Sequence, residues 1–94
     1  MSRRWADGEY LCFVVRRDLR WSQRAAQLAH AADEWHREHG YHGGPVLVFG
    51  VSDTARLERL FAATADAVGF REPDLGDELT AFATRQIVPG LRLL

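Results

Sequence analysis

The chain has 94 residues, of which 47% are hydrophobic and 27% are charged, and its formal net charge is −1. This length fits one domain with a single hydrophobic core, and the composition is typical of a globular protein. No apolar run approaches the roughly 20 residues that a membrane-spanning helix requires, and no apolar segment of a secretion signal follows the basic N-terminus. We therefore expect one cytoplasmic domain over residues 1–94 that does not cross a membrane.

The charges are unevenly distributed. Residues 1–24 contain six arginines and three acidic residues, whereas residues 25–94 contain six arginines and ten acidic residues. The basic N-terminal part is compatible with contact to phosphate groups, although a solvated charged surface gives the same pattern. Cys12 is the only cysteine, which excludes an intramolecular disulfide and a cysteine-rich metal cluster and favours a small buried side chain.

The first half of the chain predicts a strand followed by a helix. Residues 9–16 form a continuous apolar run, typical of a central strand covered on both faces. Residues 22–38 have helical periodicity, with Ser22 as a candidate N-cap and Gly40 as a candidate C-cap. We expect one packed and one solvated side, formed respectively by Ala25, Leu28, Ala29, Ala32 and Trp35, and by Gln23, Gln27, His30 and Glu34.

The second half continues the alternation. Residues 46–51 again form a buried type of strand, and Ser52 or Asp53 can cap a helix with the apolar repeat Leu57, Leu60, Phe61, Thr64 and Val68. Residues 68–72 and 78–84 indicate two further strands, and the partly apolar tail is expected to dock against the body. The order strand, helix, strand, helix, strand, strand predicts a compact, layered α/β fold with a four-stranded mixed sheet.

A motif spans the junction between the first strand and the first helix. The segment VVRRDLRWSQRAAQLAHA, residues 14–31, resembles the type II peptidyl-tRNA hydrolases, whose pattern is V-V-R-x-D-L, a short basic loop, then A-A-Q-x-x-H-A. The matching residues are Arg16, Asp18, Leu19, Ala25, Ala26, Gln27, His30 and Ala31. The order of elements also agrees with the compact α/β fold of that family, so the resemblance covers most of the chain, but weakly between residues 40 and 68.

The C-terminal part aligns with this family in two registers. Residues 85–90, RQIVPG, superficially resemble the family segment T-Q-I-A-P-G, but this register leaves no final strand and places Ala81 where the family has its functional aspartate. The other register pairs GFREPD with the acidic turn of the family and LTAFAT with its closing strand, which brings Glu72 to the aspartate position. We adopt this second register, which is more similar to a short, divergent branch of peptidyl-tRNA-hydrolase-domain proteins.

Two features of the family differ in this chain. The Gly- and Lys-rich loop after D-L is about two residues shorter, with Arg20 or Arg24 as the only candidates to replace its lysine. The threonine that follows the family aspartate has no clear counterpart. The resemblance implies an enzyme that cleaves peptidyl- or aminoacyl-tRNA esters without a metal or organic cofactor. The alternatives are a module that binds tRNA or another partner without turnover, and a domain of this fold for an uncharged substrate or a protein partner.

Hydrolysis of such an ester requires a positioned water, an acceptor for its proton and donors to the developing oxyanion. The resemblance implies catalytic roles for His30, Glu72 and Asp18, with Glu72 or His30 orienting or deprotonating the water. It assigns substrate binding to Arg16, Arg20, Arg24, Gln27 and Trp21. The same residues have simpler interpretations: Asp18 can accept backbone N–H bonds in its loop, and the others can be solvated surface groups.

Other polar and aromatic residues carry weaker signals. His39 and His42 have a spacing found in metal sites, but Gly40 separates them and no carboxylate triad accompanies them, so we expect no metal. Among the three tryptophans, Trp35 fits the core and only Trp21, next to an arginine, remains a candidate for stacking on RNA. An exposed strand edge leaves a homodimer open. A hydrolytic centre further requires that the polar side of the first helix meets Glu72 in one solvent-open cleft.

Overall fold

The structure is a computed structural model that describes residues 10–88 and 90–94. Trp5 and the two arginines at positions 3 and 4, which belong to the basic N-terminal part, lie outside these residues. The elements are β1 (Leu11–Arg16), α1 (Trp21–His39), β2 (Val46–Val51), α2 (Thr54–Ala63), β3 (Val68–Glu72), the 3₁₀ helix η1 (Pro73–Leu75), β4 (Glu78–Thr84) and β5 (Arg92–Leu93). Neither helix of the described part is long and apolar enough to cross a membrane.

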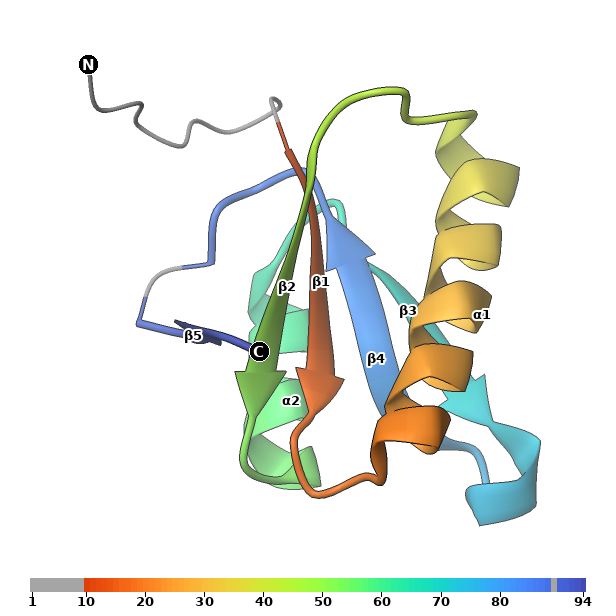
Figure 1. Cartoon of the computed structure of the whole chain (residues 1–94), viewed down its shortest axis with the longest axis vertical. Coiled ribbons are helices and arrows are strands. Elements are labelled where there is room, and N and C mark those ends of the chain that lie inside the picture. The colour runs from red at the N-terminus through yellow and green to blue at the C-terminus, as the bar shows by residue number, and fades with distance from the viewer. Residues whose placement is uncertain (1–9, 89) are drawn as a thin grey trace.

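The strands form one mixed sheet in the order β3-β4-β1-β2-β5. β1 pairs in parallel with β2 and antiparallel with β4, so it lies at the centre of the sheet, as the sequence predicted. β3 pairs antiparallel with β4, and β5 pairs antiparallel with β2. α1 covers one face of the sheet and α2 covers the other (Figure 1). The predicted α/β class with a mixed sheet is therefore confirmed.

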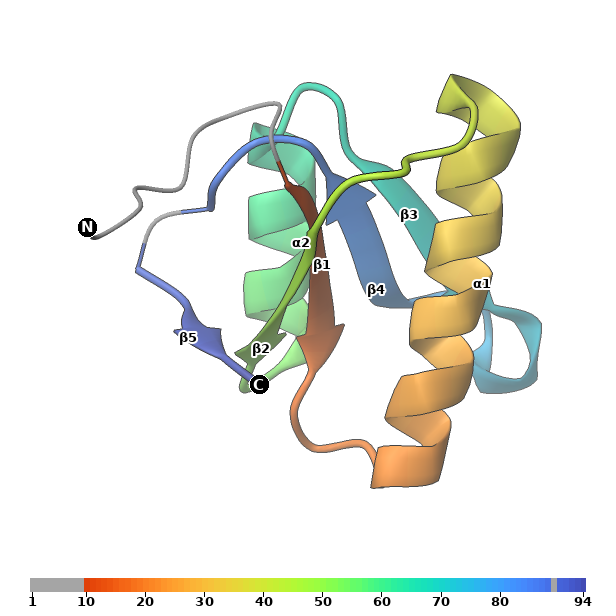
Figure 2. The same ribbon diagram turned by 45° about the horizontal axis from the view of Figure 1, so that its top comes forward.

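The sheet has five strands, whereas the sequence analysis predicted four. The additional strand, β5, pairs with Phe49 and Gly50 at the edge of β2 (Figure 2). It forms because the tail does dock on the body: Ile87, Val88 and Leu91 pack against the core. A strand of two residues is too short to show an alternating pattern, so the sequence predicted the docking of the tail but not its pairing.

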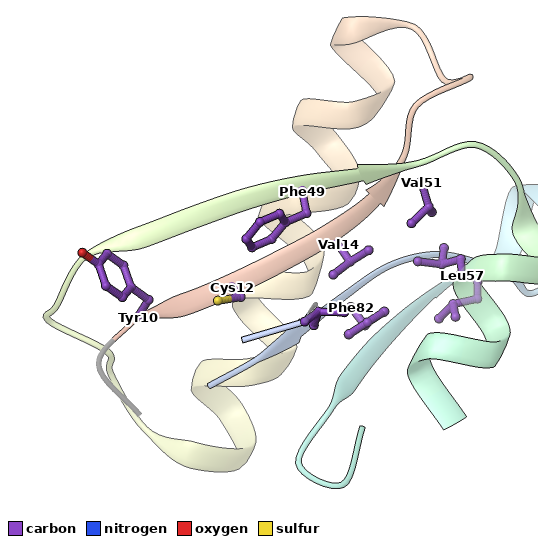
Figure 3. Packing of buried hydrophobic residues seen from close by; sticks show 9 residues of the cluster. Tyr10, Cys12, Val14, Phe49, Val51, Leu57 and Phe82 are labelled. Carbon is purple, nitrogen blue, oxygen red and sulfur yellow. The ribbon is translucent and has the colours of Figure 1, made fainter. Parts of the chain in front are cut away.

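Two hydrophobic clusters join the layers. The cluster between the sheet and α2 contains Tyr10, Cys12, Val14, Phe49, Val51, Leu57, Leu79, Phe82 and Val88 (Figure 3). The cluster between the sheet and α1 contains Leu11, Phe13, Val15, Ala31, Trp35, Val68, Ala81 and Ala83. Successive residues of β1 enter the two clusters alternately, which explains why this strand is apolar throughout. Cys12 is fully buried, as the sequence analysis predicted.

The helix ends are set by local capping. α1 begins one residue before Ser22, which is therefore not its N-cap, and Gly40 ends the helix as predicted. The φ of 84° at Gly40 lies in the region that favours glycine. Asp53 caps α2 by accepting a hydrogen bond from the backbone N–H of Arg56 at 2.8 Å, which confirms one of the two predicted caps. α2 is shorter than its apolar repeat suggested, because Val68 begins β3.

The buried face of α1 differs from the predicted one. Trp35 is buried as expected, but Ala25 and Ala29 are exposed, and Gln27 and Ala31 are buried in their place. The placement of Gln27 on the solvated side was therefore wrong. The prediction assigned the apolar side of the helical wheel to the core and the polar side to solvent. A polar side chain such as that of Gln27 can nevertheless be buried when the fold supplies its hydrogen-bond partners.

The two tryptophans of α1 provide a matched test of this packing. Trp35 is 2% exposed and Trp21 is 76% exposed. Trp35→Ala is expected to lower the free energy of unfolding by about 3–5 kcal/mol, because it removes a large side chain from the core. Trp21→Ala should change it by no more than about 0.5 kcal/mol. Urea unfolding monitored by circular dichroism measures both, and equal losses would contradict the packing described.

Candidate functional site

The carboxyl ends of β1, β2 and β3 lie at the same edge of the sheet, because β1 and β3 both run antiparallel to β4. The N-termini of both helices are at this edge (Figure 1). Ligand sites in α/β proteins commonly occur at this position. A cleft of about 210 Å³ opens there, lined by Leu19, Gln23, Gln27, Glu72, Asp74 and Leu75.

Gln27 joins α1 to this edge of the sheet. Its side chain is buried, and its Nε2 donates to Glu72 Oε2 at 3.1 Å. Its Oε1 accepts a hydrogen bond from the Thr80 hydroxyl at 2.8 Å. Burying an amide without partners costs free energy, so these two bonds explain how a glutamine occupies the packed face of an alanine-rich helix.

A β-bulge presents Thr80 to α1. The pairing of β3 with β4 shifts between Phe70 and Arg71, which leaves Thr80 as an extra residue in β4. Such bulges redirect a side chain, and here the Thr80 hydroxyl contacts Gln27 and lies 3.4 Å from the Phe70 carbonyl oxygen. The sequence analysis did not identify this residue, for which the available signal was a hydroxyl in the middle of the apolar run LTAFAT.

Glu72 is held as a carboxylate at the end of β3. Its Oε1 accepts a hydrogen bond from the backbone N–H of Asp74 at 3.2 Å, and the following Pro73 favours the extended backbone that Glu72 adopts. The hydrogen bond from Gln27, followed by that from Asp74, lowers the pKa of Glu72, and the nearby His30 contributes in the same direction. Glu72 is therefore better suited to orienting a water or balancing positive charge than to accepting a proton.

His30 lies at the surface, near enough to this carboxylate to help lower its pKa. It follows Gln27 by about one turn of α1, is exposed, and stacks on Phe70 with ring centroids 4.5 Å apart. Phe70 precedes Glu72 in β3, so the stacking keeps the imidazole close to the carboxylate. The structure thus joins Gln27 and Glu72 directly and lines the cleft with both, whereas His30 lies on the neighbouring surface and is not among the residues that line the cleft.

Asp18 and Arg16 form a separate ion pair after β1. Nε and Nη2 of Arg16 donate to the two carboxylate oxygens of Asp18 at 3.0 and 2.7 Å, and its Nη1 lies 3.1 Å from Glu78 Oε2. The hydrogen bonds from Arg16 lower the pKa of Asp18 and raise that of Arg16 itself. Among residues 10–88 and 90–94, no hydrogen bond links this pair to Gln27 or Glu72. The pair orders the loop between β1 and α1.

Arg20, Trp21 and Arg24 belong to the segment whose Leu19 and Gln23 line the cleft. Arg20 and Trp21 are exposed, whereas Arg24 is half-buried. The Nε atom of Arg24 is buried and has no hydrogen-bond partner among the residues that the structure describes. A buried guanidinium N–H of this kind is a candidate donor to an oxygen of a bound ligand.

The histidines around the end of α1 have other contacts. The His39 ring stacks on Trp35 with centroids 4.0 Å apart, and His42 Nε2 lies 3.1 Å from the Pro45 carbonyl oxygen. In the part of the chain that the structure describes, no three His, Cys, Asp or Glu side chains gather as they would around a metal ion.

Comparison of the chain with models of known protein families finds no match, and comparison with curated proteins finds none. The function is therefore proposed from the geometry of the cleft, the residues that form it and the motif resemblance in residues 14–31.

The Gln27 contact can be tested through the pKa of Glu72. Gln27→Met removes the hydrogen bond that lowers this pKa most, so the pKa should rise toward the ordinary value of 4.5. A carboxyl whose pKa is lowered by folding stabilises the fold above its unfolded pKa, and this stability is lost as pH falls. The wild type should therefore lose more stability than Gln27→Met as pH falls below about 4.5.

Carbon-detected NMR of the Glu72 carboxyl measures the pKa directly, and urea unfolding at several pH values measures the stability. Gln86→Met is the matched control, because Gln86 is exposed and bonds to Thr84 only through its backbone N–H. A Glu72 pKa that is the same in the wild type and in Gln27→Met would contradict the assigned hydrogen bond.

Proposed function

We propose that the protein hydrolyses the ester bond of peptidyl- or aminoacyl-tRNA and has a fold similar to that of the type II peptidyl-tRNA hydrolases. The observation that carries this proposal is the hydrogen bond between Gln27 and Glu72. It joins the A-A-Q-x-x-H-A motif to the acid that precedes the proline turn, and both residues line one solvent-open cleft. These are the two parts of the chain in which the resemblance to the family assigns functional residues.

In the proposed reaction, His30 acts as the general base and Glu72 stabilises its charged form. His30 accepts the proton of the attacking water, because histidine is the residue type that most often acts as a general base. When the bond between the acyl carbon and the ribose oxygen breaks, the imidazolium returns this proton to the departing oxygen, which gives a free carboxylic acid and the tRNA hydroxyl. Glu72, whose pKa is lowered, stays ionised and stabilises the positive charge that develops on the imidazole. The Nε2 group of Gln27 carries a second N–H, which can donate to the ester carbonyl as negative charge develops on its oxygen.

We assign Thr80 to orienting Gln27 and Arg24 to binding the substrate. Thr80 donates to Gln27 Oε1, and this bond directs the N–H groups of Gln27 toward Glu72 and the cleft. We therefore treat Thr80 as a positioning residue. Arg24, with its unpartnered Nε, is the better of the two arginine candidates to replace the lysine of the family, and it would bind an oxygen of the substrate.

Substrate recognition is assigned to the exposed start of α1. Arg20 would contact phosphate, and Trp21 would stack on an unpaired base at the 3′ end of tRNA. Arg16 is already paired with Asp18 and Glu78, so we give these residues the task of ordering the loop rather than a direct contact. We propose no cofactor, and we propose a cytoplasmic location because the substrate arises in translation.

A module that binds tRNA without turnover is the second candidate. It is favoured by two features of the same site: Glu72 has a lowered pKa and is a weak base, and His30 has no hydrogen-bond partner within the described residues. Catalytic histidines are commonly oriented by such a partner. In this alternative, the cleft holds the acylated end of tRNA but does not activate water.

Release of the acyl group from an N-blocked aminoacyl-tRNA tests the proposal. His30→Ala is expected to lower the rate by about 10²- to 10⁴-fold, since a general base contributes in this range. Glu72→Gln should also lower the rate, because the imidazolium that forms loses its counter-charge. His36→Ala and Glu38→Gln, which alter the same residue types at the other end of α1, should retain the wild-type rate. The rate should not change when EDTA is added.

Measuring tRNA binding alongside acyl release distinguishes the enzyme from the binding module. Tight binding of tRNA without release by the wild type would contradict the enzyme and support the module. Absence of both binding and release would reject both functions. Because phosphate contacts release counterions, binding should also weaken steeply as the salt concentration rises, and a flat salt response would exclude tRNA as the ligand.

A further inference from the structure

A second pocket, strongly basic, adjoins the loop between β1 and α1. It has a volume of about 220 Å³ and is lined by Arg17, Gly50, Ser52, Arg56, Gly90, Leu91 and Arg92. Arg17 lines this pocket and Leu19 lines the cleft. These residues are two positions apart, so their Cα atoms are at most about 7 Å apart and the pocket lies close to the cleft. Three arginines and no acidic residue line the pocket, although the net charge of the chain is −1.

These three arginines are not paired with acidic residues of the described part of the chain. Elsewhere in the protein, Arg16, Arg37 and Arg71 each lie within 3 Å of a carboxylate oxygen. Within residues 10–88 and 90–94, none of the three pocket guanidinium groups forms an ion pair. Like charges that converge without counterions repel one another, so this arrangement favours the binding of an anion.

The backbone of β2 holds one of these arginines in place. A Cβ atom added to Gly50 would overlap Cγ of Arg17 and would lie 3.0 Å from Cδ1 of Leu94. The stem of Arg17 therefore crosses directly over Gly50, and its backbone N–H donates to the Val51 carbonyl at 2.7 Å. Gly50 also pairs with Arg92, so the short strand β5 brings a second guanidinium to the same place.

The third arginine comes from the first turn of α2. Arg56 is half-buried, and its backbone N–H is already bound by the capping carboxylate of Asp53, so its side chain is the group left for a ligand. Ser52 adds a hydroxyl to the lining, and this hydroxyl lies 3.3 Å from the Asp53 carboxylate. The pocket thus combines guanidinium groups from the β1–α1 loop, α2 and β5, which are far apart in the sequence.

We propose that Arg17, Arg56 and Arg92 bind a phosphate group in a pocket that is separate from the Gln27–Glu72 cleft. Guanidinium groups match phosphate oxygens with paired hydrogen bonds, and a phosphate monoester offers three acceptor oxygens and up to about two negative charges. A carboxylate has only two oxygens and one charge, which is a poorer match to three arginines. Because an internal phosphodiester also has only two free oxygens and one charge, the phosphate is a monoester, which belongs either to the end of an RNA strand or to a small phosphorylated molecule.

Titration of the wild type with inorganic phosphate at constant ionic strength, followed through the arginine Nε–H signals in NMR, tests the site. The signals of Arg17, Arg56 and Arg92 should shift together with one dissociation constant. Arg17→Gln and Arg92→Gln should each weaken phosphate binding by about tenfold or more, because a charge-assisted hydrogen bond is lost. The control is Arg59→Gln, an exposed arginine of α2 outside the pocket.

Signals of the pocket arginines that respond to phosphate no more than that of Arg59 would overturn the proposal. A second measurement identifies the source of the phosphate. If it is RNA, Arg17→Gln weakens tRNA binding by about tenfold and reduces the salt slope by about 0.7–0.9, whereas Arg59→Gln changes neither. If it is a small molecule, phosphate binding depends on these arginines and tRNA affinity does not. Neither measurement depends on ester hydrolysis, so the phosphate site can be confirmed or rejected whether or not the protein is a hydrolase.

Discussion

The buried amide of Gln27 is the interaction on which the carboxyl edge of the sheet depends. A glutamine on the packed face of a helix must find both an acceptor and a donor, and here β3 supplies the Glu72 carboxylate and β4 the Thr80 hydroxyl. The two partners are 45 and 53 residues away in the chain. One side chain therefore sets the position of α1 against two strands. The cleft lies between the start of α1 and the end of β3.

This arrangement also separates two acidic residues that would otherwise repel each other. Glu72 and Glu78 are direct partners in the pairing of β3 with β4, and like charges in such positions are unfavourable. Glu72 bonds to Gln27 of α1, whereas Glu78 accepts a hydrogen bond from Thr54 of α2 and pairs with Arg16. Each carboxylate thus accepts a hydrogen bond from a different helix. The ion pairs of Arg16 with Glu78 and Asp18 also order the β1–α1 loop.

The sequence predicted the strands and helices that have continuous or periodic apolar patterns. β2, β3 and β4 have the predicted bounds, and β1 is central as its unbroken apolar run indicated. The contact between Glu72 and α1 was also anticipated, but only through the resemblance to a family. The burial of Gln27 and the bulge at Thr80 were not predictable, because both depend on partners from distant segments. For the same reason, no local pattern revealed that Arg17, Arg56 and Arg92 line one pocket.

Hydrogen exchange of the Gln27 side-chain amide tests the central interaction most directly. Gln23 and Gln86 are exposed and provide internal references in the same spectrum. If the Gln27 amide is buried and donates to Glu72, its N–H signals should exchange with water far more slowly than those of both references, and Glu72→Gln or Thr80→Val should accelerate the exchange. Exchange of the Gln27 amide at the rate of Gln23 and Gln86 would contradict the account.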